Sequence, residues 1–165
     1  MQTVKNDTYF MRQALLQAKK AYTAGEVPVG AVLVRQNQII ARAYNKRETN
    51  RCATAHAELL CIQKACKKLE NWRLSDCTLY VTLEPCPMCA GAIVNAHIPK
   101  IVYGAPDLQS GACGSFLSIP AMGLLNHTAE IVPNVLKEDC AALLKQFFQN
   151  VRSRGARKKQ EFFSK

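Results

Sequence analysis

The sequence lacks any long hydrophobic run. No window approaches the roughly 18 apolar residues that a membrane-spanning helix requires. The first residues, MQTVKNDTYFMRQ, also lack the apolar core and the small-residue cleavage site of a secretion leader. We therefore expect a cytoplasmic protein that has no membrane partner.

Repeats, low-complexity tracts and linker-like stretches rich in proline, glycine and serine are equally absent from the sequence. Their absence argues against a repeat architecture and leaves no obvious internal domain boundary. The 165 residues match one ordinary domain, and 48% hydrophobic residues are enough to bury a core. We expect residues 1–165 to form a single domain that ends in a basic helix or tail.

Acidic residues are scarce, because 12 aspartates and glutamates stand against 22 lysines and arginines, for a net charge of +10. Such an excess favours an acidic partner, either a nucleic acid or a membrane surface, and charge alone does not choose between them. The basic residues crowd toward the C-terminus, where Arg152, Arg154 and Lys158 are candidate RNA contacts. The alternative is a solvated tail that only keeps the protein soluble.

The sequence has eight cysteines. Without a secretion leader a reducing compartment is expected, in which disulfides are rare. Most of the eight are explained as small core residues or stand without a close partner. Cys86 and Cys89 differ, because they stand three positions apart in TLEPCPMCAG, directly after an apolar segment typical of a strand. Paired cysteines in a reduced protein more often bind metal or carry out redox chemistry.

Hydrophobic periodicity predicts alternating helices and strands. Helices are expected from Asp7 or Thr8 to Gly25, over 55–69, over CPMCAGAIVNA, and from Lys137 to about Arg152 with Phe147 and Phe148 in the core. Strands are expected at VGAVLV, QIIARAYN, CTLYVTL, KIVYGA and, more weakly, TAEIVP, and the first two form a hairpin around Gln36 and Asn37. This alternation predicts an α/β protein whose sheet is covered by helices on both faces.

Cys86 and Cys89 can direct both sulfurs at one ion from a helix N-terminus, where the helix dipole favours thiolate. Two ligands hold no zinc, so a third must come from elsewhere in the chain. His56 stands at the start of the preceding helix, and a β-α-β arrangement sets both helix starts at the same edge of the sheet. His97 and His127 are expected to lie away from this point. We predict one zinc ion per chain.

Three protein ligands leave one coordination position for water, which is typical of a catalytic zinc. Zinc lowers the pKa of such a water to about 7. Glu58 begins the same helix as His56, so it can take the proton of the water and deliver it to a leaving nitrogen. The alternative is a glutamate that only interacts favourably with the helix dipole.

HAE, followed about 27 residues later by PCPMC, resembles the signature of the zinc-dependent cytidine/deoxycytidylate deaminase superfamily. Over residues 5–155, from VPVGAVLV through TLYVTLEPCPMCAGAI and VYGAPD to DCAALL, the chain is similar to the bacterial tRNA-specific adenosine deaminase family. The resemblance implies that His56, Cys86 and Cys89 hold zinc and that Glu58 carries protons.

The same resemblance implies a cytidine deaminase-like fold, a three-layer α/β/α sandwich with a mixed five-stranded sheet. It implies a homodimer that uses a zinc-activated water to convert adenosine to inosine at the wobble position in the anticodon loop of a tRNA. In this family's pattern, Asn45 hydrogen-bonds the base and Val29 and Ala55 form the pocket wall. Asp107 lies near the neighbours of the flipped-out nucleotide.

The sequence departs from the family's pattern at two places. Cys52 and Ala53 stand where the family usually has Asp-Pro, and Pro106 stands where it often has arginine or aspartate. None of these residues touches a proposed zinc ligand. Both departures can alter loops that meet RNA.

Three other classes of function share parts of this pattern. A thioredoxin-like redox protein also has C-x-x-C at a strand-to-helix junction, but it leaves HAE unexplained and would have tryptophan in place of Pro85. A deaminase of a free base or nucleoside, such as guanine or cytosine, shares every zinc residue but has no need of a basic tail. A binding module with a structural zinc needs a fourth protein ligand, for which the sequence offers no suitable residue.

Overall fold

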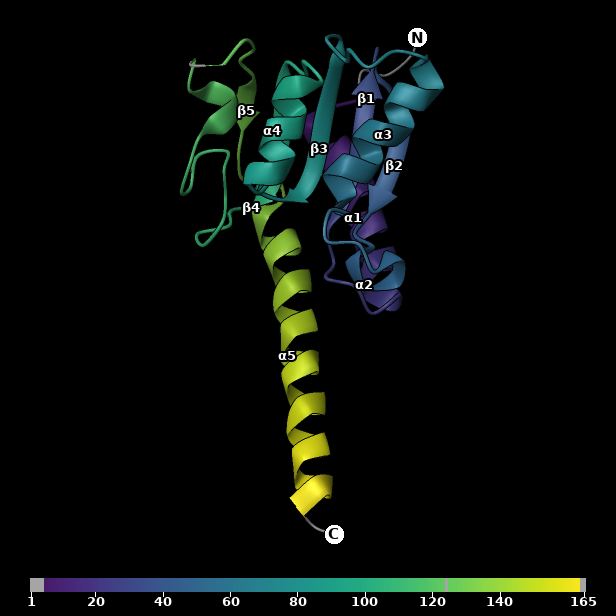
Figure 1. Ribbon diagram of the computed structural model, residues 1–165, viewed down its shortest axis with the longest axis vertical. Coiled ribbons are helices and arrows are strands. Elements are labelled where there is room, and N and C mark those ends of the chain that lie inside the picture. Colours follow the sequence, from purple (N-terminus) through teal and green to yellow (C-terminus); the bar gives the residue numbers. More distant parts are fainter. Residues whose placement is uncertain (1–4, 124, 164–165) are drawn as a thin grey trace.

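The computed structural model describes residues 5–123 and 125–163, with side chains described as far as Arg154. Its strands are β1 (Gly30–Arg35), β2 (Gln38–Tyr44), β3 (Cys77–Leu83), β4 (Lys100–Ala105) and β5 (Glu130–Val132). They form a sheet in the order β2-β1-β3-β4-β5 (Figure 1). β1 is antiparallel to β2 and β3, whereas β3, β4 and β5 are parallel. The mixed five-stranded sheet is therefore confirmed.

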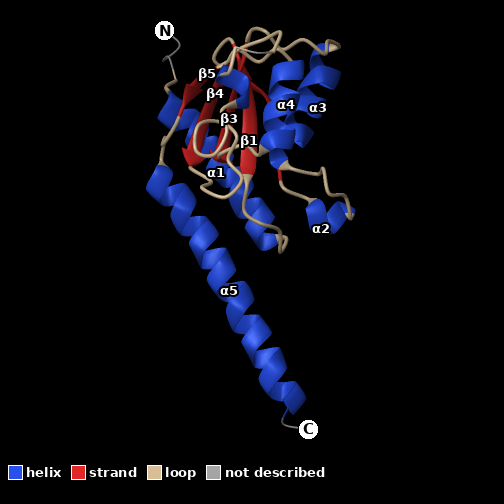
Figure 2. Ribbon diagram, turned by 60° about the vertical axis from the view of Figure 1, so that its left-hand side comes forward, coloured by secondary structure: helices blue, strands red, loops and turns tan. Residues whose placement is uncertain are grey.

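Helices cover both faces of this sheet (Figure 2). The helices are α1 (Asp7–Thr23), α2 (Arg47–Asn50), α3 (Ala57–Leu69), α4 (Pro87–Asn95), the 3₁₀ helix η1 (Ile119–Ala121) and α5 (Lys137–Phe163). α1 and the first part of α5 pack on one face, and α3 and α4 pack on the other. The predicted three-layer α/β/α sandwich is confirmed. The short helices α2 and η1 were not expected from hydrophobic periodicity.

Successive side chains of the central strands point to opposite faces of the sheet and pack in two separate hydrophobic cores. Ala31 and Leu33 of β1 pack in the core beneath α3 and α4. Val32 and Val34 point the other way and pack in the core shared with α1 and α5. A strand covered on both faces is apolar along its whole length. This burial explains why VGAVLV reads as a continuous apolar run instead of an alternating one.

Local signals place the first helix and the hairpin close to where they were expected. α1 begins at Asp7, as predicted, but its N-cap is Asn6 and not Asp7 or Thr8, because the Asn6 side chain accepts a hydrogen bond from the Tyr9 amide at 2.9 Å. Gln36 and Asn37 have φ values of 48° and 61°, the left-handed conformations that a two-residue hairpin turn requires. The predicted hairpin is confirmed.

The last helix is longer than the sequence indicated. It was expected to end at about Arg152, but α5 continues to Phe163. The additional segment, residues 153–163, has arginine or lysine at positions 154, 157, 158 and 159, which are good helix formers, and contains no proline, although Gly155 is a poor helix former. α5 therefore leaves the body of the protein and projects well beyond the sheet (Figures 1 and 2).

One edge of the sheet collects the starts of two helices. Tyr44 at the end of β2 pairs with Gly30 at the start of β1, and Ala31 pairs with Val81 near the end of β3. β2 and β3 therefore end at the same edge. The chain leaves β3 directly into α4 and reaches α3 after β2 by way of α2. This arrangement agrees with the expected meeting of the two helix starts.

In the described part of the chain, no helix combines the length and the apolar character needed to cross a membrane.

Gly30 allows α1 to lie directly against β1, and this close approach generates a stability prediction. A Cβ atom at Gly30 would lie 2.2 Å from the Ala14 carbonyl oxygen and 2.3 Å from the Ala18 amide nitrogen. Gly30→Ala should therefore lower the free energy of unfolding by roughly 1–3 kcal/mol, as overpacking does. Urea unfolding of the purified protein measures the change.

Gly91→Ala is the matched control, because a Cβ atom at Gly91 in α4 meets nothing within 4 Å. This substitution should leave stability unchanged or raise it by up to about 1 kcal/mol, since alanine is the better helix former. Equal unfolding midpoints for the two variants would contradict the close approach at Gly30.

Candidate active site

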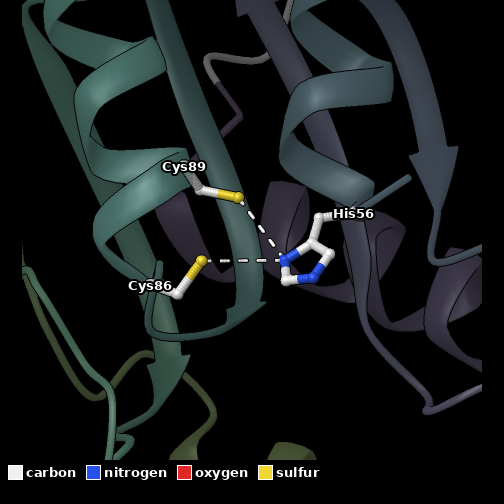
Figure 3. A group of neighbouring side chains, drawn as sticks. All are labelled: His56, Cys86 and Cys89. Carbon is white, nitrogen blue, oxygen red and sulfur yellow. Dashed lines mark hydrogen bonds between the residues drawn. The ribbon is translucent and has the colours of Figure 1, made fainter. Parts of the chain in front are cut away.

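Three predicted ligands converge at the edge where α3 and α4 begin. His56 occupies the N-cap position of α3, and Cys86 occupies that of α4, with Pro87 as the next residue. The His56 Nδ1 atom lies 3.7 Å from the Cys86 Sγ and 3.6 Å from the Cys89 Sγ (Figure 3). All three ligand atoms lie within 4.8 Å of one another. The structure therefore brings together the residues that the sequence singled out.

The three side chains also change one another's protonation. A hydrogen bond from the Cys89 thiol lowers the pKa of Cys86 to about 4. The same hydrogen bond raises the pKa of Cys89, and the hydrogen bond with Cys86 raises the pKa of His56. Cys86 is thus the thiolate of the pair. A metal ion that binds both sulfurs must displace the Cys89 proton.

The donor set suits zinc. One imidazole nitrogen and two thiolate sulfurs are ligands that zinc accepts, at bond lengths of about 2.0–2.3 Å. Three protein ligands with the fourth position open to solvent or substrate are typical of a catalytic zinc. Among the described residues, no other group of three or more histidines, cysteines and carboxylates is arranged in this way. His97 and His127 contact each other instead, with ring centroids 5.1 Å apart.

A pocket of about 410 Å³ opens beside these ligands. This volume is within the range of small-molecule sites. Residues from six separate parts of the chain line it, among them Asn45, His56, Glu58, Cys86 and Asp107. A small molecule in this pocket can therefore contact the candidate metal site, a carboxyl group and an amide at the same time.

One buried carboxyl group of this pocket belongs to Glu58. It stands in the first turn of α3, two residues after His56, and its side chain is only 4% exposed. Burial raises the pKa of Glu58 to about 7. A carboxyl group that titrates near neutral pH can both take up and release a proton, which is the property of a general acid-base group.

Three of the four residues predicted to contact the substrate line this pocket. Val29 and Asn45 are buried and line the pocket, and Asp107 lines it from the loop after β4. Ala55 is buried but is not among the lining residues, and its carbonyl oxygen accepts a hydrogen bond from the Lys46 amide at 2.9 Å. Its neighbour Ala57 lines the pocket instead, because α3 begins there.

The loop that carries Asp107 is organised around the buried carboxylate of Glu84. Glu84 accepts hydrogen bonds from the amides of Asp107 at 2.9 Å, Cys113 at 3.0 Å and Ser115 at 2.9 Å. Asp107 in turn accepts hydrogen bonds from the Ser110 amide and hydroxyl. Glu84 was not singled out by sequence analysis. Its position between a strand and PCPMC was the available signal.

Phe148 and Arg47 are among the other pocket residues that sequence analysis missed. Phe148 was expected in the core of the last helix, but it is 45% exposed and lines the pocket. That prediction was wrong, because α5 turns this side chain toward the helix starts while Phe147 packs against Tyr22. Arg47 lines the pocket from α2, a helix too short to produce a hydrophobic period.

The candidate RNA contacts lie on the projecting part of α5. Arg152 and Arg154 are exposed. Lys158 belongs to the same helix, but its side chain lies outside the described residues. The two described arginines follow Phe148 along α5, within two turns of it. A polymer that enters the pocket can therefore reach them.

Comparison with known proteins identifies relatives along almost the whole chain. Residues 5–152 match the model of the MafB19-like deaminase family. The tRNA-specific adenosine deaminase of Bacillus subtilis (strain 168) is 50% identical over 148 residues, which cover 90% of this chain and 92% of the relative. That of Streptococcus pyogenes serotype M18 (strain MGAS8232) is 41% identical, covering 92% and 96%.

Solved structures of deaminases share the fold. A structure from a study of A-to-I editing by tRNA:A34 deaminases at the wobble position of transfer RNA superposes with a TM-score of 0.79 and 40% identity. The match covers 82% of this chain and 99% of that one. The guanine deaminase of Bacillus subtilis gives a TM-score of 0.59 at 42% identity, over 62% and 66% of the two chains. The chain belongs to the MafB19-like deaminase family and, within it, to the tRNA-specific adenosine deaminases.

Proposed function

We propose that this protein is a zinc-dependent hydrolase that converts adenosine to inosine at the wobble position in the anticodon loop of a tRNA. The observation that carries the proposal is the meeting of His56, Cys86, Cys89 and Glu58 at one pocket. The relatives named above, which match nearly the whole chain, support the choice of tRNA as substrate. The reaction adds water across the C6 position of adenine and releases ammonia.

His56, Cys86 and Cys89 are the proposed ligands of one zinc ion per chain. Bound zinc supplies a Lewis acid that lowers the pKa of water to about 7. Glu58 performs the proton transfers in this proposal, taking a proton from the attacking water and giving protons to N1 and to the departing ammonia. Its buried position in the first turn of α3 places it beside the ligands without making it one of them.

The wall residues position the base in this proposal. Asn45 orients the purine ring through its side-chain amide, and Val29 contributes an apolar contact. Ala55 supports the wall through its hydrogen bond to the Lys46 amide. Asp107 lies at the side where the neighbouring nucleotides enter. An adenosine can reach such a pocket only when it is splayed out of its loop, as single-stranded RNA recognition generally requires.

The residues at the pocket opening suit an RNA chain more than an isolated base. The exposed ring of Phe148 offers a surface on which a flanking base can stack. Arg47 at the pocket and Arg152, Arg154 and Lys158 along α5 are proposed phosphate contacts. A free base or nucleoside would use none of these groups.

The remaining features of the proposal concern the whole protein. One domain over residues 1–165 is supported by the single continuous sheet and by a family match that spans residues 5–152. A homodimer is supported by large apolar side chains that are exposed in one chain, such as Trp72, Leu108 and Phe116. We place the protein in the cytoplasm, a location that a tRNA substrate supports.

The direct test of function is incubation of the zinc-loaded protein with a tRNA anticodon stem-loop that has adenosine at the wobble position. Sequencing of the RNA should show inosine, read as guanosine, at that position alone. Free adenosine, guanine, cytosine and cytidine should be poor substrates, because binding energy from flanking nucleotides contributes to the reaction. Turnover of a free base far faster than the stem-loop would establish the alternative, a free-base deaminase.

Glu58→Ala and His56→Ala separate the proton carrier from a ligand. Glu58→Ala should keep one zinc per chain and lower the rate by ~10²–10⁴, the usual cost of removing general acid-base catalysis. His56→Ala should lose zinc as well as activity. Metal analysis and single-turnover rates measure both effects. Near-normal activity of Glu58→Ala, or zinc retained at full occupancy without His56, would contradict these roles.

The proposed RNA-binding residues of α5 are tested by salt dependence. Replacing Arg152 and Arg154 with alanine should weaken stem-loop binding and reduce the salt slope by ~0.7 for each single-stranded phosphate that the protein no longer neutralises. Truncation after Val151 should reduce it further. The charge-matched control replaces Lys67 and Lys68, which are exposed in the last turn of α3, and should leave binding unchanged. If replacing Lys67 and Lys68 weakened stem-loop binding as much as replacing Arg152 and Arg154, the net charge of the protein alone would explain the effect, and the assignment of the two arginines as RNA contacts would be wrong.

A further inference from the structure

A second buried carboxylate, Glu26, lies beside the pocket and has no part in the chemistry proposed above. It stands between α1 and β1 and is 1% exposed. Its two oxygens accept three hydrogen bonds from the segment that follows β2. The donors are the Thr49 amide at 2.7 Å, the Glu48 amide at 3.2 Å and the Asn45 side-chain nitrogen at 3.4 Å.

Glu26 caps α2 from a distance. The N-cap residue of α2 is Lys46, whose side chain makes no capping hydrogen bond. Glu48 and Thr49 are the second and third residues of this helix, and their amides are those that an N-cap side chain normally satisfies. Glu26, about twenty positions earlier in the chain, supplies the missing acceptor. The place of α2, and with it that of Arg47 at the pocket, depends on this carboxylate.

Glu26 is ionised at neutral pH. Burial by itself acts to raise its pKa, but hydrogen bonds from the amides of Thr49, Glu48 and Arg47 outweigh burial and hold the pKa of Glu26 below its usual value. An ionised carboxylate only accepts hydrogen bonds. The Asn45 amide must therefore turn its nitrogen toward Glu26, because its oxygen would be repelled there.

The backbone of Asn45 is held independently of Glu26. Its amide nitrogen donates to the Val29 carbonyl oxygen at 3.0 Å, and the next residue, Lys46, donates to the Ala55 carbonyl oxygen at 2.9 Å. The remaining freedom at Asn45 is rotation of its side chain. Glu26 restricts that rotation and leaves the amide oxygen and the second N–H of Asn45 to the pocket.

We propose that Glu26 is a positioning residue for the deamination, which sets the orientation of the Asn45 amide and anchors α2 at the pocket. The inference rests on the proposed function, since it takes Asn45 as the residue that orients the base. Glu26 itself touches neither the substrate nor the candidate metal ligands. It acts by the charge and the acceptor-only character of its carboxylate.

Glu26→Gln tests this role with almost no change of shape. Both oxygens of Glu26 accept hydrogen bonds from N–H groups. Whichever way the glutamine side chain is turned, its NH2 group therefore faces one of these donors and cannot accept its hydrogen bond. Turnover of the stem-loop, measured as kcat/KM, should fall roughly 10- to 100-fold, as small misplacements at an active site do. The loss should appear in kcat, with one zinc per chain retained. Glu48→Gln is the charge-matched control, because Glu48 is exposed on the same helix, and it should leave kcat unchanged.

A double-mutant cycle shows whether Glu26 acts through Asn45. In the Asn45→Ala background, Glu26→Gln should lower the rate by less than about threefold, because the group that it positions has been removed. A role in stability alone would lower the rate by the same factor in both backgrounds. Equal factors in the two backgrounds, or an unchanged rate for Glu26→Gln in the native background, would overturn the proposal.

The Asn45 side-chain amide can also be observed directly, whatever the substrate is. In ¹⁵N-labelled zinc-loaded protein, one of its two Nδ2 protons should exchange slowly. This signal should shift in Glu26→Gln and stay in place in Glu48→Gln. Rapid exchange of both protons in the unmodified protein would overturn the proposal even if Glu26→Gln does not fold. Failure of the unmodified protein to deaminate the stem-loop, with the protected proton present, would overturn the proposed function and leave Glu26 orienting Asn45 for another substrate.

Discussion

Two helices that begin side by side at one edge of the sheet are the constraint on which the site depends. β1 is antiparallel to both of its neighbours, so β2 and β3 end at this edge and deliver the chain to α3 and α4. His56 and Cys86 occupy the two N-cap positions, and neither side chain makes a capping hydrogen bond. Both are therefore directed toward each other, and the amides at the helix starts favour the thiolate form of sulfur. A change in the direction of β1 would separate the ligands.

Two of the segments that line the pocket, α2 and the loop after β4, are each held by a buried carboxylate. Glu26 receives the amides of α2, and Glu84 receives three amides from the loop that carries Asp107. Hydrogen bonds to a charged acceptor are stronger than those between neutral groups, and buried amides need a partner. The loop fits closely around Glu84, because a Cβ atom at Gly111 would lie 2.4 Å from its Oε2. Buried charge thus holds in place the two pocket segments that lie outside the sheet and its long covering helices.

α5 connects the core to the surroundings of the pocket. Its first part packs on the sheet through Cys140, its middle brings Phe148 to the pocket, and its projecting part exposes Arg152 and Arg154. One continuous helix therefore connects the pocket residue Phe148 with the basic residues. The excess of positive charge in the sequence becomes directional in this way, since part of it lies along α5, which projects beyond the sheet (Figure 1).

The sequence by itself determined the sheet, its covering helices, the candidate metal ligands and the carboxyl group beside them. Strand and helix periods are local properties, and the spacing of His56, Glu58, Cys86 and Cys89 relative to the predicted elements was enough to bring them together. Only the tertiary structure decided the rest. The sequence predicts that Phe148 is a core residue, and only the direction of α5 shows that it lines the pocket. Ala57 lines the pocket in place of Ala55, because α3 begins at Ala57. Glu26 reaches Asn45 and Glu84 reaches Cys113 across long separations in the chain, and hydrogen bonds between distant segments leave no periodic trace in a sequence.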